Sequence, residues 1–193
     1  MEIVPIFVNK ATRQGLYSLA YDGAENEWDR LLDLWNRQDY LFNVYRENRS
    51  IIRNGCFKHM KGEDVLDQIL TVARKLENTL LKLEKQGVEK GISLLKTHFR
   101  PLHPLQTGDT LPGNKGLEEI NVQDVALPAL SFFGLGLEEN TFIITGGCIN
   151  FTPFLGDRQE SIREIEKLKE AEGFLLENQF TLTHQKFYYY GNS

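Results

Sequence analysis

The chain has 193 residues, 41% of them hydrophobic and 25% charged, which is an ordinary balance for one globular domain. Its net charge of −5 at pH 7 argues against a broad basic surface for nucleic-acid phosphates, and all of the excess acid lies after residue 90. No stretch approaches the roughly 18 apolar residues of a membrane span, and the first residues are too polar for a signal peptide. We therefore expect a cytoplasmic protein with no membrane contact.

The first expected elements are two short strands. The segments EIVPIFV and GLYSLAYD are rich in β-forming residues and are separated by polar turn residues, so they predict a β-hairpin. Pro5 has no N–H group to donate, which places the first strand at a sheet edge or at a bulge. From Glu25 onward the apolar residues follow a helical period, and residues 25–48 are expected to form a helix.

Three further helices are predicted from the spacing of apolar residues. Over 63–86 leucine, isoleucine and alanine recur every three or four positions, and Gly87 follows, which is typical of a long amphipathic helix with a glycine stop. A short helix is expected over 92–99, closed by prolines, and another amphipathic helix over 157–178. The helix over 63–86 should pack beside that over 25–48.

Turn-forming residues at 107–116 predict a loop before the two longest apolar runs of the chain. Residues 127–137 and 141–152 have the length and composition of two antiparallel strands and should form most of the sheet. Residues 180–190 close the chain as a last strand or a packed tail. This order predicts a single α+β domain over 1–193, an antiparallel sheet with a block of helices packed on one side.

The second of these strands contains two adjacent glycines, Gly146 and Gly147. Glycine weakens the interior of a strand, because it adds backbone entropy to the unfolded chain and has no side chain to pack. We therefore expect either that the backbone bends or bulges at this point, or that another group comes very close to the strand.

Two features of the sequence leave alternatives open. Cys56 and Cys148 lie far apart and fit either two free thiols in a reducing compartment or a disulfide. The stretch 45–61 is rich in arginine and lysine, and it fits either a solvated linker between helices or a phosphate-binding patch.

The sequence has none of the standard catalytic or metal-binding motifs, so no metal and no cofactor are expected. In the segment KTHFRPLHP, His98 and His103 flank Arg100, and Lys96 stands just before them. Two imidazoles and two cations so close together suit the binding of a phosphate and the movement of a proton, as acid–base cleavage of RNA requires. The alternative is that they are ordinary surface residues at the end of a helix.

A second candidate segment, THQKFYYYGN, lies near the C-terminus. It contains His184 and Lys186, followed by three consecutive tyrosines. In a strand Tyr188 and Tyr190 share one face, and Tyr189 takes the other. The pair is expected either to pack in a core or at a partner interface, or to stack on nucleotide bases.

Residues from about 91 to 178 contain a short helix ending in FRPLHPL, a loop ending in PGNKG, the strand pair FFGLGLEENTFIITGGCINFT and the charged helix REIEKLKEAEGFLL. This order resembles the RelE/ParE superfamily, in particular its HigB-like branch. Gly147 matches the strand glycine of that family, and Thr152 matches its closing threonine. Asn150 and Phe151 stand where basic residues are typical.

The resemblance implies a small toxin of a toxin–antitoxin pair, an endoribonuclease that cuts mRNA on the ribosome without a metal and is neutralised by a bound antitoxin. Residues 1–90 would be an N-terminal hairpin and helical extension, and 91–193 would be the RelE-like sheet and C-terminal helix. In that arrangement the loop before the hairpin and the C-terminal segment flank one working surface. His98, His103 and His184 would then supply the acid or base.

On the same surface Lys96, Arg100 and Lys186 would hold RNA phosphates, and Tyr188 or Tyr190 would stack on a base. The resemblance also implies that the glycine pair lets the strand twist or bulge so that the following helix crosses it closely. The acidic second half favours a different function on the same scaffold, a non-catalytic module that binds a protein partner through its long helices. The oligomeric state is left open.

Overall fold

A computed structural model describes residues 1–54, 57–86, 88–102, 129–137, 140–152 and 159–191 of the chain. The helices and strands follow one another in the order β1 (Glu2–Val8), β2 (Gly15–Ala20), α1 (Glu27–Asn36), α2 (Gln38–Glu47), α3 (Arg49–Asn54), α4 (Gly62–Lys85), α5 (Val88–His98), β3 (Phe99–Pro101), β4 (Leu130–Gly136), β5 (Thr141–Ile149), α8 (Gln159–Glu177) and β6 (Phe187–Tyr190). Within these ranges no helix combines the length and the apolar character that crossing a bilayer requires. The predicted loop at 107–116 lies outside the described residues.

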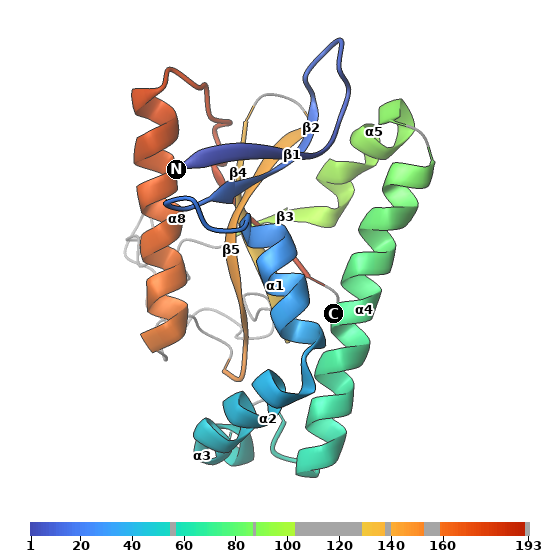
Figure 1. Cartoon of the computed structure of the whole chain (residues 1–193), viewed down its shortest axis with the longest axis vertical. Helices are drawn as coiled ribbons and strands as arrows, with labels where there is room; N and C mark the ends of the chain where they lie inside the picture. The colour runs from blue at the N-terminus through green and yellow to red at the C-terminus, as the bar shows by residue number, and fades with distance from the viewer. Residues whose placement is uncertain (55–56, 87, 103–128, 138–139, 153–158, 192–193) are drawn as a thin grey trace, which may run out of the picture.

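The six strands form one sheet in the order β1–β2–β5–β4–β6–β3. Neighbouring strands are antiparallel, except that β2 and β5 run parallel. A parallel pair needs a long crossover connection, and the helices α1–α5 lie within it. The predicted α+β class, with a block of helices packed on one side of a mainly antiparallel sheet, is confirmed (Figure 1).

Both faces of the sheet are covered, each by a different set of helices. The helices α1, α4 and α5 pack on one face, where Trp35, Leu76 and Phe132 belong to the larger apolar cluster. The helix α8, which is outside that block, packs on the opposite face, where Leu168 and Phe133 belong to a second cluster. Figure 1 shows the sheet between α8 on one side and α4 with α5 on the other.

The central strands β4 and β5 alternate their side chains between the two clusters. Phe132 and Phe142 face the helical block, whereas Phe133 and Ile143 face α8. A strand that is buried on both faces has no polar side, so its sequence is a continuous apolar run. For this reason the length and apolar composition of β4 and β5 indicate strands, whereas their sequences show little alternation of polar and apolar residues.

The expected helix over 25–48 is two helices, α1 and α2, separated by Arg37 in an extended conformation (φ −89°, ψ 115°). Trp35 and Leu41 are each 1% exposed. In one straight helix these two residues would point about 120° apart, since six residues advance the helix by about 600°. The break at Arg37 therefore allows both side chains to enter the same core. The helix predicted over 63–86 is confirmed as α4, and it packs against α1 and α2.

The predicted N-terminal hairpin is confirmed as β1 and β2, which pair antiparallel. Pro5 lies on the edge strand β1, and the register shifts between Pro5 and Phe7. Pro5 therefore lies both on an edge strand and at a bulge, the two positions expected for it. The last segment forms a strand only over Phe187–Tyr190, and the predicted short helix at 92–99 is part of α5, whose end continues into the edge strand β3.

The second half of β5 has no strand beside it where β2 ends. β2 pairs only with Thr141–Ile144, so the backbone groups that follow need other partners. The Tyr21 hydroxyl donates a hydrogen bond to the carbonyl oxygen of Thr145 (2.8 Å), and the Gly147 N–H donates to the Glu164 carboxylate (2.9 Å). Side chains therefore replace the missing strand at this edge.

These side chains belong to a network of ion pairs that joins the two helical layers. Glu27 of α1 accepts two hydrogen bonds from the Arg30 guanidinium (2.9 and 2.6 Å). The Lys167 ammonium lies 3.3 Å from the Glu27 carboxylate and 3.2 Å from that of Glu164, both of them largely buried. Burial raises the pKa of the Glu164 carboxyl, although Lys167 and the Gly147 N–H oppose this. We call Glu27, Arg30, Glu164 and Lys167 the edge network.

Close contacts explain the pair of glycines in β5, and the edge network provides the contact at Gly146. A Cβ atom on Gly146 would overlap the Glu164 carboxylate of α8. A Cβ on Gly147 would lie 2.6 Å from the Ser131 carbonyl oxygen and 3.0 Å from Leu31 Cδ1. The register of β4 and β5 also shifts next to Gly146. The predicted bulge and the predicted close crossing by the following helix are therefore both confirmed.

Gly173 provides a control for these two glycines, because the position of its Cβ within α8 is open. Gly147→Ala should lower the free energy of unfolding by about 1–3 kcal/mol, since its methyl group presses on the backbone of β4. Gly146→Ala should cost less, because a carboxylate yields more easily than a backbone. Gly173→Ala should instead stabilise the protein by about 0.5–1 kcal/mol, because glycine inside a helix is unfavourable. Urea unfolding measures all three changes, and an unchanged midpoint for Gly147→Ala would contradict this packing.

Candidate functional site

An open hollow of ≈ 820 Å³ lies where α4 and α5 meet the sheet edge formed by β3 and β6. Its polar lining comes from four elements and consists of Gln68, Lys75, Asn78, Thr79 and Lys82 of α4, Thr97 and His98 of α5, Arg100 of β3, and Tyr190 of β6. We call it the basic hollow. It lies on the side of the sheet that carries the helical block, and it contains part of each of the two segments singled out from the sequence.

Strand pairing brings these two segments together. β3 and β6 are antiparallel neighbours, with Phe99 opposite Tyr190 and Arg100 opposite Tyr189. Because α5 ends at His98 and continues directly into β3, its last turn is held beside the C-terminal strand. The ring of His98 meets the ring of Tyr190 edge to face, with centroids 6.2 Å apart.

The long helix α4 provides the opposite wall of the hollow. Its residues Val72, Lys75, Thr79 and Lys82 recur at intervals of three or four and so form one stripe along the helix. The adjacent stripe, which includes Leu76, is buried in the core. The hollow therefore extends along α4 beside the part of the helix that packs on the sheet.

The charge of the lining is positive. Lys75, Lys82 and Arg100 contribute three cations, and no carboxylate is among the described residues that line the hollow. Within the described part of the chain none of the three has an ion-pair partner within 4.0 Å. Three such cations around one concave surface favour an anionic ligand, because the wall excludes part of the screening solvent.

His98 is the titratable side chain of the hollow that can move a proton near neutral pH. Burial lowers the pKa of its imidazole below the usual value of about 6.5. At pH 7 the ring is therefore neutral, and a neutral imidazole can accept a proton from a ligand.

Tyr190 has a structural role in this wall. It is 1% exposed, and its hydroxyl donates a hydrogen bond to the carbonyl oxygen of Leu76 (2.9 Å). Its ring stacks with Phe99 and with Phe132, at centroid distances of 5.5 and 6.2 Å. Burial raises the pKa of its hydroxyl far above the usual value. The ring leaves no open face on which a nucleotide base could stack, so the expected core packing holds at this position.

Tyr188 and Lys186 are not part of the basic hollow. The Tyr188 ring packs edge to face on Phe142, with centroids 5.1 Å apart. The Lys186 ammonium forms an ion pair of 2.6 Å with Glu172 of α8. This ion pair places Lys186 on the opposite face of the sheet, because α8 covers that face.

Of the remaining predicted residues, His184 and Lys96 are exposed and lie outside the lining of the hollow. His103 lies outside the described residues. The structure therefore brings together His98, Arg100 and Tyr190 of the eight residues expected at the site. It adds Lys75 and Lys82, which sequence reasoning missed. The polar stripe of α4, beside its leucine stripe, could have indicated these two lysines. It was not used, because a charged stripe on a helix usually faces solvent.

One of the two cysteines, Cys148, lies among the described residues. There, no group of three or more His, Cys, Asp and Glu side chains is arranged to hold a metal ion. Cys148 is buried, and its thiol donates a hydrogen bond to the Asn150 side-chain oxygen (3.0 Å). Cys56 lies outside the described residues, so the two alternatives for this pair stay open.

The lowered pKa of His98 predicts a pH dependence of stability. The unfolded chain binds the proton more readily than the folded protein, so this residue makes the free energy of unfolding fall as the pH falls through about 6.5. His98→Gln should remove that part of the slope. Urea unfolding at a series of pH values between about 5 and 8 provides the test. If His98→Gln leaves the pH dependence of the free energy of unfolding unchanged, His98 has the same pKa in the folded and the unfolded chain.

Comparisons with known proteins do not identify the chain. No protein-family model matches it, and neither does any curated protein or solved structure. The resemblance to RelE/ParE toxins stays a prediction, and the proposals below depend on the geometry of the described residues.

Proposed function

We propose that this chain is a toxin-like RNA-binding protein that holds the phosphates of single-stranded mRNA in the basic hollow and cleaves the strand there. The observation that carries the proposal is the set of three cations, Lys75, Lys82 and Arg100, around one hollow without a carboxylate among the described lining residues. Phosphates are bound chiefly by arginine and lysine, which supply most of the affinity for a nucleic-acid backbone.

An extended strand suits this hollow better than a compact anion. From Gln68 to Lys82 the lining follows about 21 Å of helix, at about 1.5 Å for each residue. Lys75 and Lys82 stand two turns apart on that helix, so they suit successive phosphates. Asn78, Thr79 and Thr97 add hydroxyl and amide groups, which can bind sugar hydroxyls and base edges.

In this proposal His98 acts as the base in cleavage without a metal. Its neutral imidazole would take the proton of a ribose 2′-hydroxyl, whose oxygen attacks the adjacent phosphorus. The bond from phosphorus to the 5′-oxygen then breaks, which leaves a 2′,3′-cyclic phosphate and a 5′-hydroxyl that receives a proton from the imidazolium or from water. The Arg100 guanidinium would stabilise the negative charge that builds on the phosphate.

Binding is tested with a fluorescein-labelled single-stranded RNA and fluorescence anisotropy. The triple variant Lys75→Ala/Lys82→Ala/Arg100→Ala should bind more weakly. The slope of log Kd against log salt concentration should fall by about 0.7 for each phosphate contact that is lost. The matched control is Arg74→Ala/Lys85→Ala, two exposed cations of the same helix that do not line the hollow. Equal affinity of the triple variant and the wild type would overturn the proposed site, and so would an equal loss in the control.

Cleavage is a separate test, made in the presence of a metal chelator. The wild type should convert the RNA to products with a 2′,3′-cyclic phosphate, and it should leave the same strand with 2′-deoxyribose intact. His98→Ala should lose about 100-fold or more in rate while it keeps RNA binding, whereas His184→Ala should cleave like the wild type. Inducible expression should arrest growth only for variants that cleave. RNA binding without cleavage, together with harmless expression, would refute the ribonuclease proposal and favour a non-catalytic interaction module.

A further inference from the structure

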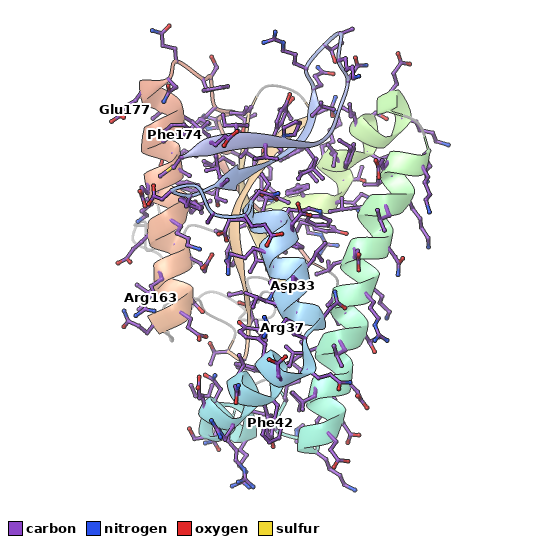
Figure 2. All side chains as sticks on the ribbon, viewed as in Figure 1. Asp33, Arg37, Phe42, Arg163, Phe174 and Glu177 are labelled. Atoms are coloured by element: carbon purple, nitrogen blue, oxygen red, sulfur yellow. The ribbon has the colours of Figure 1, made fainter. Side chains whose placement is uncertain are left out.

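One end of the molecule, formed by α2, α3 and the start of α4, exposes a large aromatic side chain. Phe42 of α2 is 56% exposed, although the neighbouring Leu41 and Val44 are buried in the core. Figure 2 labels Phe42 at this end, away from the sheet. A phenyl ring left in water keeps apolar surface unburied, and an exposed ring beside an apolar groove is a feature of interaction surfaces.

Phe42 lies beside an apolar groove of ≈ 250 Å³ between α2 and α4. The apolar walls of the groove are Leu41 and Phe42 on one side and Leu66 and Leu70 on the other. The leucines of α4 are only partly buried, because no other described element covers them. The groove is therefore a place where a further apolar side chain would be removed from water.

The charges around the groove are divided between its two walls. Glu63 and Asp67 stand on the α4 side, and Arg46 follows Phe42 by one turn on the α2 side. Within the described part of the chain none of these three has an ion-pair partner within 4.0 Å. One patch therefore carries an exposed ring, a groove that suits such a ring, an uncompensated cation and two uncompensated carboxylates.

We propose that this patch is the interface of a symmetric homodimer, in which Phe42 of each copy enters the groove of the other. A two-fold axis sets the α2 side of one copy against the α4 side of the other. Arg46 then faces Glu63 and Asp67 of the opposing copy, and both copies gain the same contacts. Isologous interfaces require this kind of self-complementary surface, and aromatic and arginine side chains are enriched in them.

The charge pattern favours a second copy over an unrelated partner. A second copy presents the opposite charge to both walls at once, because a two-fold axis sets the acidic wall of each copy against the basic wall of the other. The interface also gives a role to Arg46, which lies in the basic stretch 45–61. The proposal goes beyond the RNA-binding function and does not depend on it, because the basic hollow and the groove are lined by different residues of α4.

Sedimentation velocity from about 1 µM to about 100 µM covers dissociation constants that are typical of weak dimers. The wild type should change from monomer to dimer over this range, and Phe42→Ser should remain a monomer at every concentration. Leu176→Ser is the matched control, because Leu176 is 53% exposed on α8, and this variant should dimerise like the wild type. A wild type that stays monomeric overturns the proposal. So does a dimer that survives Phe42→Ser or is lost in Leu176→Ser.

A charge exchange tests the two-fold pairing. Arg46→Glu and Asp67→Arg should each weaken the dimer about 5-fold or more, because each sets like charges against one another. The double variant Arg46→Glu/Asp67→Arg restores opposite charges across the axis, so its dissociation constant should return toward that of the wild type. A double variant weaker than either single one would overturn this arrangement of the copies. Circular dichroism and RNA binding of each variant confirm that the fold and the basic hollow are intact.

Discussion

The arrangement of this molecule depends on the largely buried charged side chains that line β5 where β2 ends. β5 is central to the sheet, yet its partner β2 ends halfway along it. The edge network fills the gap, and it requires carboxylates from a helix on each face of the sheet, Glu27 from α1 and Glu164 from α8. Breaking a buried ion pair by removing one member costs about 3–5 kcal/mol, because the other charge is left without compensation. The network therefore fixes both helical layers on one strand.

The sequence predicted the elements wherever local pattern and tertiary packing agree. The leucine spacing of α4, the hairpin with Pro5 at its edge and the apolar runs of β4 and β5 all satisfy local rules. The pattern failed at Arg37, because the apolar residues on each side have helical spacing and only the shared core requires the break. It also did not predict β3, since Phe99–Pro101 forms a strand only because the distant β6 lies beside it.

The candidate site was predicted in part, for a physical reason. His98 and Arg100 are two residues apart, so any structure that ends α5 here keeps them together. Their meeting with Tyr190 depends on the pairing of β3 with β6, and the cations of α4 depend on helix packing, which no short motif encodes. The sequence also suggested that Lys186 would join this site. Lys186 precedes β6, and its ammonium pairs with Glu172 instead, a contact that depends on how α8 packs on the sheet.

The parallel pairing of β2 with β5 has a consequence for the order of folding. Tyr21 and Thr145, which meet at this junction, are 124 positions apart in the chain. Contacts of such large sequence separation form late, because a long loop must close before they contribute any stability. During synthesis the N-terminal hairpin therefore leaves the ribosome well before the strand that will anchor it. Until then the edge of β2 is open to other strands, and the helices α1–α5 form in the meantime as the local part of the fold.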